Sequence, residues 1–188
     1  IDNFLIEQRD KILADTLVRK LTADPLHHAP YKDLVHSAAQ VPAGFDPGLL
    51  YNSRNHPRSL QLTVYGASDA LGFSGIALED LKQIVSPNHI GVFASNSLAS
   101  VDNYSLGGLF HGYLADGKVN AKQLPLAYGQ MPADFINAYL LGSLGTTGGQ
   151  MGACATFLYN LSQATQAITT GKIKFAIVGT SDAPIVPE

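Results

Sequence analysis

The sequence predicts an α/β fold, in which helices pack on buried strands. Two short apolar runs, Ile90–Ser95 and Phe175–Gly179, have the length and composition of strands buried on both faces. Segments with apolar residues at helical spacing precede each run. Strands that alternate with amphipathic helices are typical of this fold class.

Composition limits the classes of function. At 188 residues the chain can bury one sizeable core, and 14% charged against 46% hydrophobic residues suggests a large interface with another surface. A net charge of −3 without a run of Lys or Arg makes nucleic acid an unexpected partner. No apolar run is long enough to span a bilayer. The single cysteine and the absence of a secretory signal predict a cytoplasmic protein.

In residues 1–53, the spacing of apolar residues predicts an amphipathic helix over 2–21. The prolines that follow predict an irregular connection with a short helix near 31–39. Four histidines lie in or near this connection, and none of them has the i, i+4 spacing of a zinc pair, so surface or capping roles are favoured: His27, His28, His36 and His56.

Regular elements follow from residue 54 onward. The spacing of Leu60, Val64, Ala67 and Leu71 predicts a helix over 57–73 with one apolar face. Further helices are predicted over 76–85, 133–141 and 155–171, and a short helix or turn over 104–114. The polar turn after Ile90–Ser95 lies at the carboxyl end of a strand, where α/β folds tend to place binding sites.

The small-residue segment 142–149 lacks the Gly-Lys-Ser/Thr ending of a phosphate-binding loop and is interpreted as a tight turn and the start of a strand. Glycines weaken an isolated strand, so Gly148, Gly149 and Gly152 indicate that another backbone approaches closely.

Cys154 lies where this segment enters the helix predicted over 155–171. Free N–H groups and the helix dipole favour a thiolate at such a position, and the same N–H groups can hold the oxyanion that forms when a thiolate attacks an acyl group. The turn therefore suits formation of an acyl-enzyme. The alternative is a small buried side chain without a chemical role.

The motif Gly-Ala-Cys-Ala-Thr, followed by a helix and the strand Phe175–Gly179, resembles the active-site region of the β-ketoacyl-acyl-carrier-protein synthases. These condensing enzymes, here of the KAS I/II-like type, belong to the thiolase superfamily. Asp182 stands where a Glu is common in the family's strand-end motif. The resemblance covers Arg54 to Glu188, and implies the N-terminal half of a thiolase-like, layered αβαβα fold, with residues 1–53 as a separate N-terminal region.

The resemblance implies that Cys154 accepts an acyl group from an acyl-CoA or acyl-ACP thioester. Condensation with malonyl-ACP by decarboxylative Claisen chemistry would follow, in fatty acid or polyketide biosynthesis. The family also uses two histidines and a lysine, which are expected outside this sequence. No cofactor and no metal are implied.

The resemblance also suggests substrate-pocket residues. Leu98 matches a pocket or gate position, and Met131 lies in a segment that the family places near the nucleophile. Phe157 brings bulk that would shorten or redirect the acyl pocket. For Leu98 and Phe157, ordinary core packing is the alternative.

Partners follow from the same resemblance. Arg54 and Arg58 could meet an acidic acyl carrier protein, or they could belong to a solvated helix start. The strand before Cys154 would pair with its twin in a homodimer.

The sequence leaves three alternative functions open: a thiolase-type acyltransferase, a non-catalytic partner subunit of the chain-length-factor kind, and a cysteine hydrolase. The retained cysteine disfavours the non-catalytic subunit.

Overall fold

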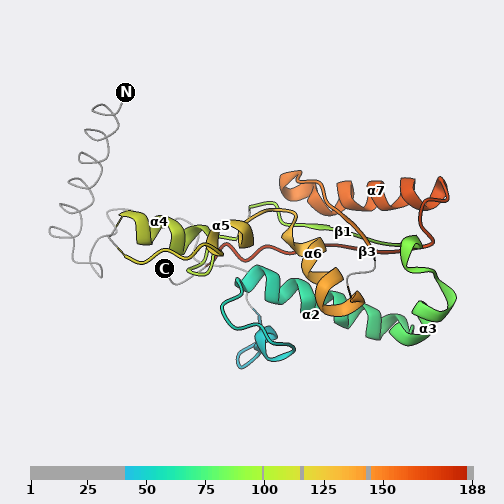
Figure 1. Cartoon of the computed structure of the whole chain (residues 1–188), viewed down its shortest axis with the longest axis horizontal. Coiled ribbons are helices and arrows are strands. Elements are labelled where there is room, and N and C mark those ends of the chain that lie inside the picture. Colours follow the sequence, from blue (N-terminus) through green and yellow to red (C-terminus); the bar gives the residue numbers. More distant parts are fainter. Residues whose placement is uncertain (1–40, 99, 115–116, 143–144, 186–188) are drawn as a thin grey trace. The chain divides into compact units, whose positions relative to one another are not determined.

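The computed structural model describes residues 41–98, 100–114, 117–142 and 145–185 (Figure 1). The chain divides into two units, 1–42 and 43–188, and the description below concerns the second. The helices predicted over 2–21 and 31–39 lie outside the described residues. The division predicted at Arg54 rested on where the family motifs begin, and it stays a prediction.

A three-stranded parallel sheet forms the centre of the second unit, which confirms the predicted α/β class. Its order is β2 (Thr146–Gly148), β1 (Ile90–Ser95) and β3 (Phe175–Thr180). All six residues of β1 are buried, because this strand has a neighbour on each side and helices on both faces. Since the strands are parallel, their carboxyl ends meet at one edge of the sheet.

Helices cover both faces of the sheet. Helix α7 (Thr156–Thr169) packs on one face, and α2 (Arg58–Ser74) and α6 (Met131–Ile136) pack on the other (Figure 1). Side chains of β1 alternate between the two: Val92 and Ala94 belong to the cluster with α2 and α6, whereas Phe93 packs with α7. This α/β/α arrangement is the first half of the expected layered fold.

Shorter elements connect these parts. They are η1 (Pro47–Leu49), α3 (Leu78–Ile84), η2 (Pro87–His89), α4 (Leu106–Leu114), α5 (Gln123–Leu126), the π-helical η3 (Asn137–Leu141) and η4 (Ala153–Ala155). None of the helices in the described ranges is long and apolar enough to cross a membrane.

The helix predicted over 133–141 differs in its limits and its form. It begins at Met131, because Pro132 fits the first turn, where its missing N–H costs no hydrogen bond. After Ile136 the chain widens into the π-helical turn η3, which brings Leu141 into the core and ends at Gly142 with a φ of 78°. Only glycine adopts this left-handed conformation without strain.

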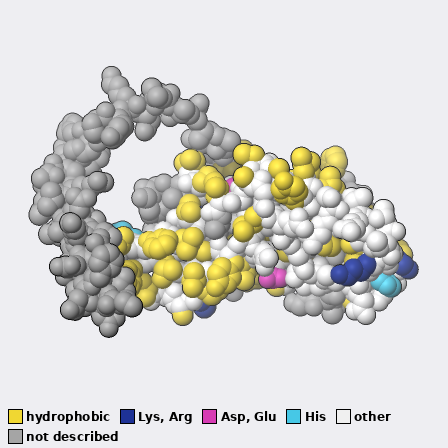
Figure 2. All heavy atoms as spheres, turned by 90° about the horizontal axis from the view of Figure 1, so that it is seen from above, with side chains coloured by type: hydrophobic (Ala, Val, Ile, Leu, Met, Phe, Trp, Pro, Cys, Tyr) yellow, Lys and Arg dark blue, Asp and Glu magenta, His cyan; other side chains and the backbone are white. Residues whose placement is uncertain are grey.

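Helix α7 packs on the sheet through the side that carries its smaller side chains. Its buried residues are Thr156, Asn160, Ala164 and Ala167, whereas Phe157, Leu158, Leu161 and Ile168 are between 42% and 62% exposed. The alternative that Phe157 packs in the core is therefore wrong for the described chain. Small residues let the helix lie close to the sheet, and the large apolar side chains point away from it. Figure 2 shows many hydrophobic and few charged side chains on the face seen from above.

Candidate active site

Cys154 lies in the 3₁₀ turn η4, two residues before the first residue of α7, and its side chain is exposed. The segment that leads into this turn leaves β2 at the edge where the parallel strands end. The predicted entry from a strand into a helix at Cys154 is therefore present. The accessible thiol also contradicts the alternative of a small buried side chain.

The residue before Cys154 has an unusual backbone conformation. Ala153 has a φ of 48°, in the left-handed region that alanine rarely adopts. Such a conformation costs about 1–3 kcal/mol and persists only where the surroundings enforce it. Thr156, 1% exposed, does so through its hydroxyl, which donates to Ala153 O at 2.7 Å and accepts from Gly152 N at 3.0 Å.

Three glycines allow close approaches around this turn. A Cβ on Gly149 would lie 2.6 Å from Ala94 O, and one on Gly152 would lie 2.0 Å from the Tyr159 ring. A Cβ on Gly129 would lie 2.2 Å from Met151 Sδ. The predicted approach of another backbone is present only at Gly149, where β1 makes it; Gly148 and Gly152 meet side chains instead.

The loop after β1 is tied to the end of β3 by a carboxylate. Asp182 accepts hydrogen bonds from Ser97 N at 3.0 Å, from Ser97 Oγ at 2.7 Å and from Leu98 N at 3.1 Å. The backbone at Leu98 is therefore fixed, although its side chain is 57% exposed. The sequence singled out Asp182 only as a motif position, because a contact across 85 residues leaves no local pattern.

The three predicted pocket residues have different surroundings. Leu98 and Phe157 are exposed, whereas Met131 packs against the buried cluster of Leu60, Val64 and Phe135. No hydrogen bond or hydrophobic cluster in the described ranges joins these side chains to Cys154. Their assignment to an acyl pocket stays a prediction.

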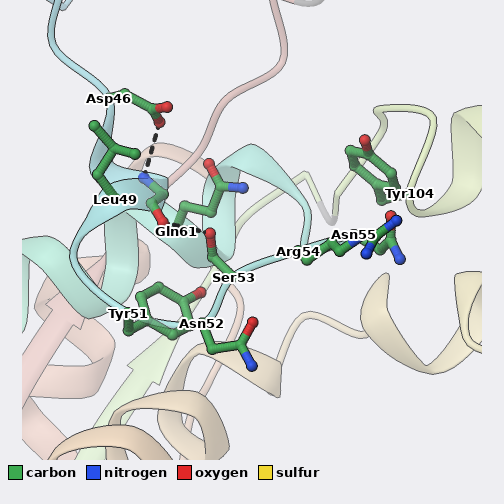
Figure 3. Close-up of a pocket in the computed structure, with 10 residues that line it drawn as sticks. Asp46, Leu49, Tyr51, Asn52, Ser53, Arg54, Asn55, Gln61 and Tyr104 are labelled. Carbon is green, nitrogen blue, oxygen red and sulfur yellow. Dashed lines mark hydrogen bonds between the residues drawn. The ribbon is translucent and has the colours of Figure 1, made fainter.

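A polar cleft of about 420 Å³ is lined in part by Gln61 of α2, and Cys154 is not among its lining residues (Figure 3). Arg54, Asn55 and Tyr104 lie together at one end of it. Two smaller cavities adjoin this end, since both are lined by Asn55 and by Lys122. Arg54 and Lys122 are exposed, which makes the cleft rim attractive to anionic groups. Its full lining is Asp46, Gly48, Leu49, Tyr51, Asn52, Ser53, Arg54, Asn55, Gln61 and Tyr104.

An aromatic cluster with two perturbed groups borders the cleft. His56 Nδ1 lies 3.3 Å from the Tyr51 hydroxyl, and both rings contact Tyr139. Burial, with the Lys122 ammonium as a second cause, lowers the pKa of His56. Burial first and Tyr139 second raise the pKa of Tyr51. Neither here nor elsewhere in the described chain are three His, Cys, Asp or Glu side chains grouped to hold a metal ion.

Sequence reasoning found Cys154 but missed the side chains that fix its surroundings. Thr156 was part of the recognised motif without a role, and Asn160 was given no structural role. Asn160 accepts from Gln150 N at 2.8 Å and donates to Ser95 Oγ at 2.9 Å. No local signal in the sequence marks Asn160, because its partner Ser95 lies 65 residues away.

Taken together, a parallel sheet covered on both faces and a cysteine turn at its carboxyl edge define the cysteine-bearing half of a thiolase-like fold. The family model for the beta-ketoacyl synthase, N-terminal domain, matches residues 10–188, and the chain belongs to this family. The match begins well before Arg54, where the recognised motifs begin.

Similar proteins agree with this assignment. The chain is 51% identical over 154 residues to the beta-ketoacyl-[acyl-carrier-protein] synthase FabY of Pseudomonas aeruginosa, covering 82% of this chain and 24% of that protein. The crystal structure of the ketosynthase FabY from P. aeruginosa matches with a TM-score of 0.74 and 50% identity, over 78% of this chain and 23% of that one. The fatty acid synthase alpha subunit stcJ of Emericella nidulans is 28% identical over 116 residues, 60% of this chain and 7% of that protein. The chain thus spans about a quarter of FabY.

Proposed function

We propose that this chain is the nucleophile-bearing portion of a β-ketoacyl-acyl-carrier-protein synthase, and that Cys154 carries the acyl group. The observation that supports this most directly is the exposed Cys154 thiol at the head of α7, in a turn held at a strained Ala153. The 51% identity to FabY supports the same activity. The product would enter fatty acid or polyketide biosynthesis.

The proposed acyl transfer needs a nucleophile and a place for negative charge. The Cys154 sulfur forms a bond to the carbonyl carbon of an acyl-CoA or acyl-ACP thioester, and the carrier thiol leaves with the electron pair of the broken C–S bond. The oxyanion formed between these events would be stabilised by N–H groups at the head of α7.

The proposed condensation follows on the acyl-enzyme. Loss of CO₂ from malonyl-ACP leaves a carbanion, whose electron pair forms the new C–C bond to the acyl carbon. The bond from that carbon to Cys154 Sγ breaks, which regenerates the thiolate. The family uses two histidines and a lysine in this step, and we propose that these residues lie outside this sequence.

An acyl carrier protein is the proposed macromolecular partner. Arg54 lines the cleft and Lys122 lines the two cavities that adjoin it, and no ion pair of Arg54 is present among the described residues. Arg58 is a weaker candidate for contact, because its guanidinium lies 3.4 Å from Asp46 Oδ1. A cytoplasmic location belongs to the same proposal, since a free, exposed cysteine such as Cys154 persists in a reducing compartment.

A homodimer is also proposed. The strand β2 lies at one edge of the described sheet and is available to pair with a second copy. The glycines around Cys154 do not support this dimer, since Gly149 and Gly152 make their close approaches within the chain. The exposed apolar side chains of α7 support burial against further protein, whether a second copy or additional chain.

The test is to incubate the natural polypeptide that contains this sequence with an acyl-CoA, and separately with an acyl-ACP, and to measure its intact mass. An acyl adduct that maps to Cys154 and is lost in Cys154→Ser supports the proposal. Turnover that depends on malonyl-ACP separates a synthase from a thiolase-type acyltransferase. A non-catalytic partner subunit would give neither an adduct nor turnover.

A further inference from the structure

We propose that Asn160 is a positioning residue for the Cys154 turn. The proposal rests on the function proposed above, because it concerns how precisely the turn presents a thiol and N–H groups to a thioester. Asn160 lies in the second turn of α7 and is completely buried. Its amide does not contact Cys154, so it acts through the segment that leads into the turn.

Three hydrogen bonds form a closed ring around Gln150. Asn160 Oδ1 accepts from Gln150 N at 2.8 Å, and Asn160 Nδ2 donates to Ser95 Oγ at 2.9 Å. Ser95 Oγ in turn donates to Gln150 O at 2.6 Å. Both backbone groups of Gln150 are therefore bonded to side chains, and each side chain fixes the direction of the other.

A fourth hydrogen bond joins this ring to the last strand. Asn160 Nδ2 also donates to Gly179 O, at 3.0 Å. One amide thus connects α7, the end of β1, the end of β3 and the segment after β2. Ser95 is as fully buried as Asn160, so water cannot replace the hydrogen bond between these two side chains without opening the sheet edge.

The segment that contains Gln150 has little other support. The ladder between β1 and β2 ends at the pair Phe93 and Gly148, and backbone pairing with the sheet stops there. Because buried N–H and C=O groups must find partners, the side chains of Asn160 and Ser95 replace the missing ladder. The position of the chain between Gly148 and Cys154 is thereby set by Asn160 on one side and Thr156 on the other.

The chain provides a matched control at the opposite end of β2. Asn137 is also a buried asparagine that bonds to backbone: its Oδ1 accepts from Gly145 N at 3.1 Å and its Nδ2 donates to Gly145 O at 3.3 Å. It holds Gly145, the residue before β2, and not the turn after Gly148. Loss of Asn137 should therefore lower stability without altering the presentation of Cys154.

The experiment uses the natural polypeptide with Asn160→Leu, Ser95→Ala and Asn137→Leu, each checked for folding by thermal unfolding. Two rates are measured at Cys154: alkylation by iodoacetamide and acylation by an acyl-CoA. Alkylation needs an accessible thiolate, whereas acylation also needs the carbonyl oxygen to meet the N–H groups at the head of α7. The ratio of acylation to alkylation therefore reports the geometry of the turn when both rates are measured on folded protein, because an unfolded chain can still be alkylated.

We expect the ratio to fall about 100-fold in Asn160→Leu, because misplacement by about 1 Å has that effect on an aligned reaction. Ser95→Ala should lower it roughly 10-fold, since Asn160 still holds Gln150 N. If Asn160→Leu does not fold, Ser95→Ala decides the question. An unchanged ratio in the folded variants, or an equal loss in Asn137→Leu, would overturn the proposal.

A second measurement separates this proposal from the proposed function. If the unsubstituted protein takes up no acyl group, the proposed function fails. Hydrogen exchange at the Gln150 amide then tests the positioning role alone. Faster exchange in Asn160→Leu than in Asn137→Leu supports it, and equal exchange contradicts it.

Discussion

Replacing Gly149 with alanine tests how tightly the cysteine segment packs on the central strand. The added methyl would lie 2.6 Å from Ala94 O and 3.0 Å from Ser95 Cβ. Both atoms belong to β1, which is bonded to a strand on each side, so neither can move alone. The substitution must therefore displace either the central strand or the segment that leads to Cys154.

The cost follows from overpacking. Forcing one methyl into a filled site costs about 1–3 kcal/mol. For a unit of this size, each kcal/mol lowers Tm by about 2–4 °C, so Gly149→Ala should lower Tm by about 2–12 °C. The loss should also appear as a lower urea midpoint with an unchanged m-value.

Gly179→Ala is the matched control. Gly179 also lies at the carboxyl end of a strand, and a Cβ there would meet nothing within 4 Å. This variant should be as stable as the parent or more stable by roughly 0.5–1 kcal/mol, because glycine loses more backbone entropy on folding. The reasoning fails if Gly149→Ala unfolds within about 0.5 kcal/mol of the parent, or if Gly179→Ala is destabilised equally.

Three other predictions concern single side chains. Asp182→Ala should destabilise the fold by about 1–3 kcal/mol in urea unfolding, because it removes the acceptor for the backbone N–H groups of Ser97 and Leu98. Asp182→Asn keeps an acceptor oxygen and should lose less stability. Thr156→Val should cost about 1–3 kcal/mol, because it leaves a backbone N–H in the cysteine turn without its partner; an unchanged urea midpoint would contradict this. The lowered pKa of His56, caused by burial and by Lys122, means that the unfolded chain takes up a proton at higher pH than the folded chain does. Stability from His56 is therefore complete above its ordinary pKa of 6.5 and falls as the pH drops through that value, and His56→Gln should flatten this part of a plot of Tm against pH.

The sequence was most informative where burial is continuous or periodic. The strand Ile90–Ser95 was predicted with its observed limits, because six buried residues in succession leave an uninterrupted apolar run. The buried face of α2 was also predicted, since Leu60 and Val64 follow a helical period against a single neighbouring surface.

Periodicity could not show which side of α7 faces the sheet. The apolar side of this helix is the exposed one in the described chain, and the buried side carries Ala164 and a polar Asn160. Burial there is decided by how closely the helix must approach, which depends on residues such as Phe93 far away in sequence. The hydrogen bond from Asn160 to Ser95 spans 65 residues and leaves no local signal for the same reason.

The pairing of the central strand has a consequence for synthesis. The two partners of β1 lie later in the chain, and the second, β3, begins about 80 residues after β1 ends. At about 5–20 residues per second, a ribosome needs roughly 4–16 seconds to add that length. During this interval at least one edge of this largely apolar strand has no partner, and such edges invite pairing with other chains. Helices α2 and α6 are made before β3, so contact with them is the earliest protection available to β1 on the growing polypeptide.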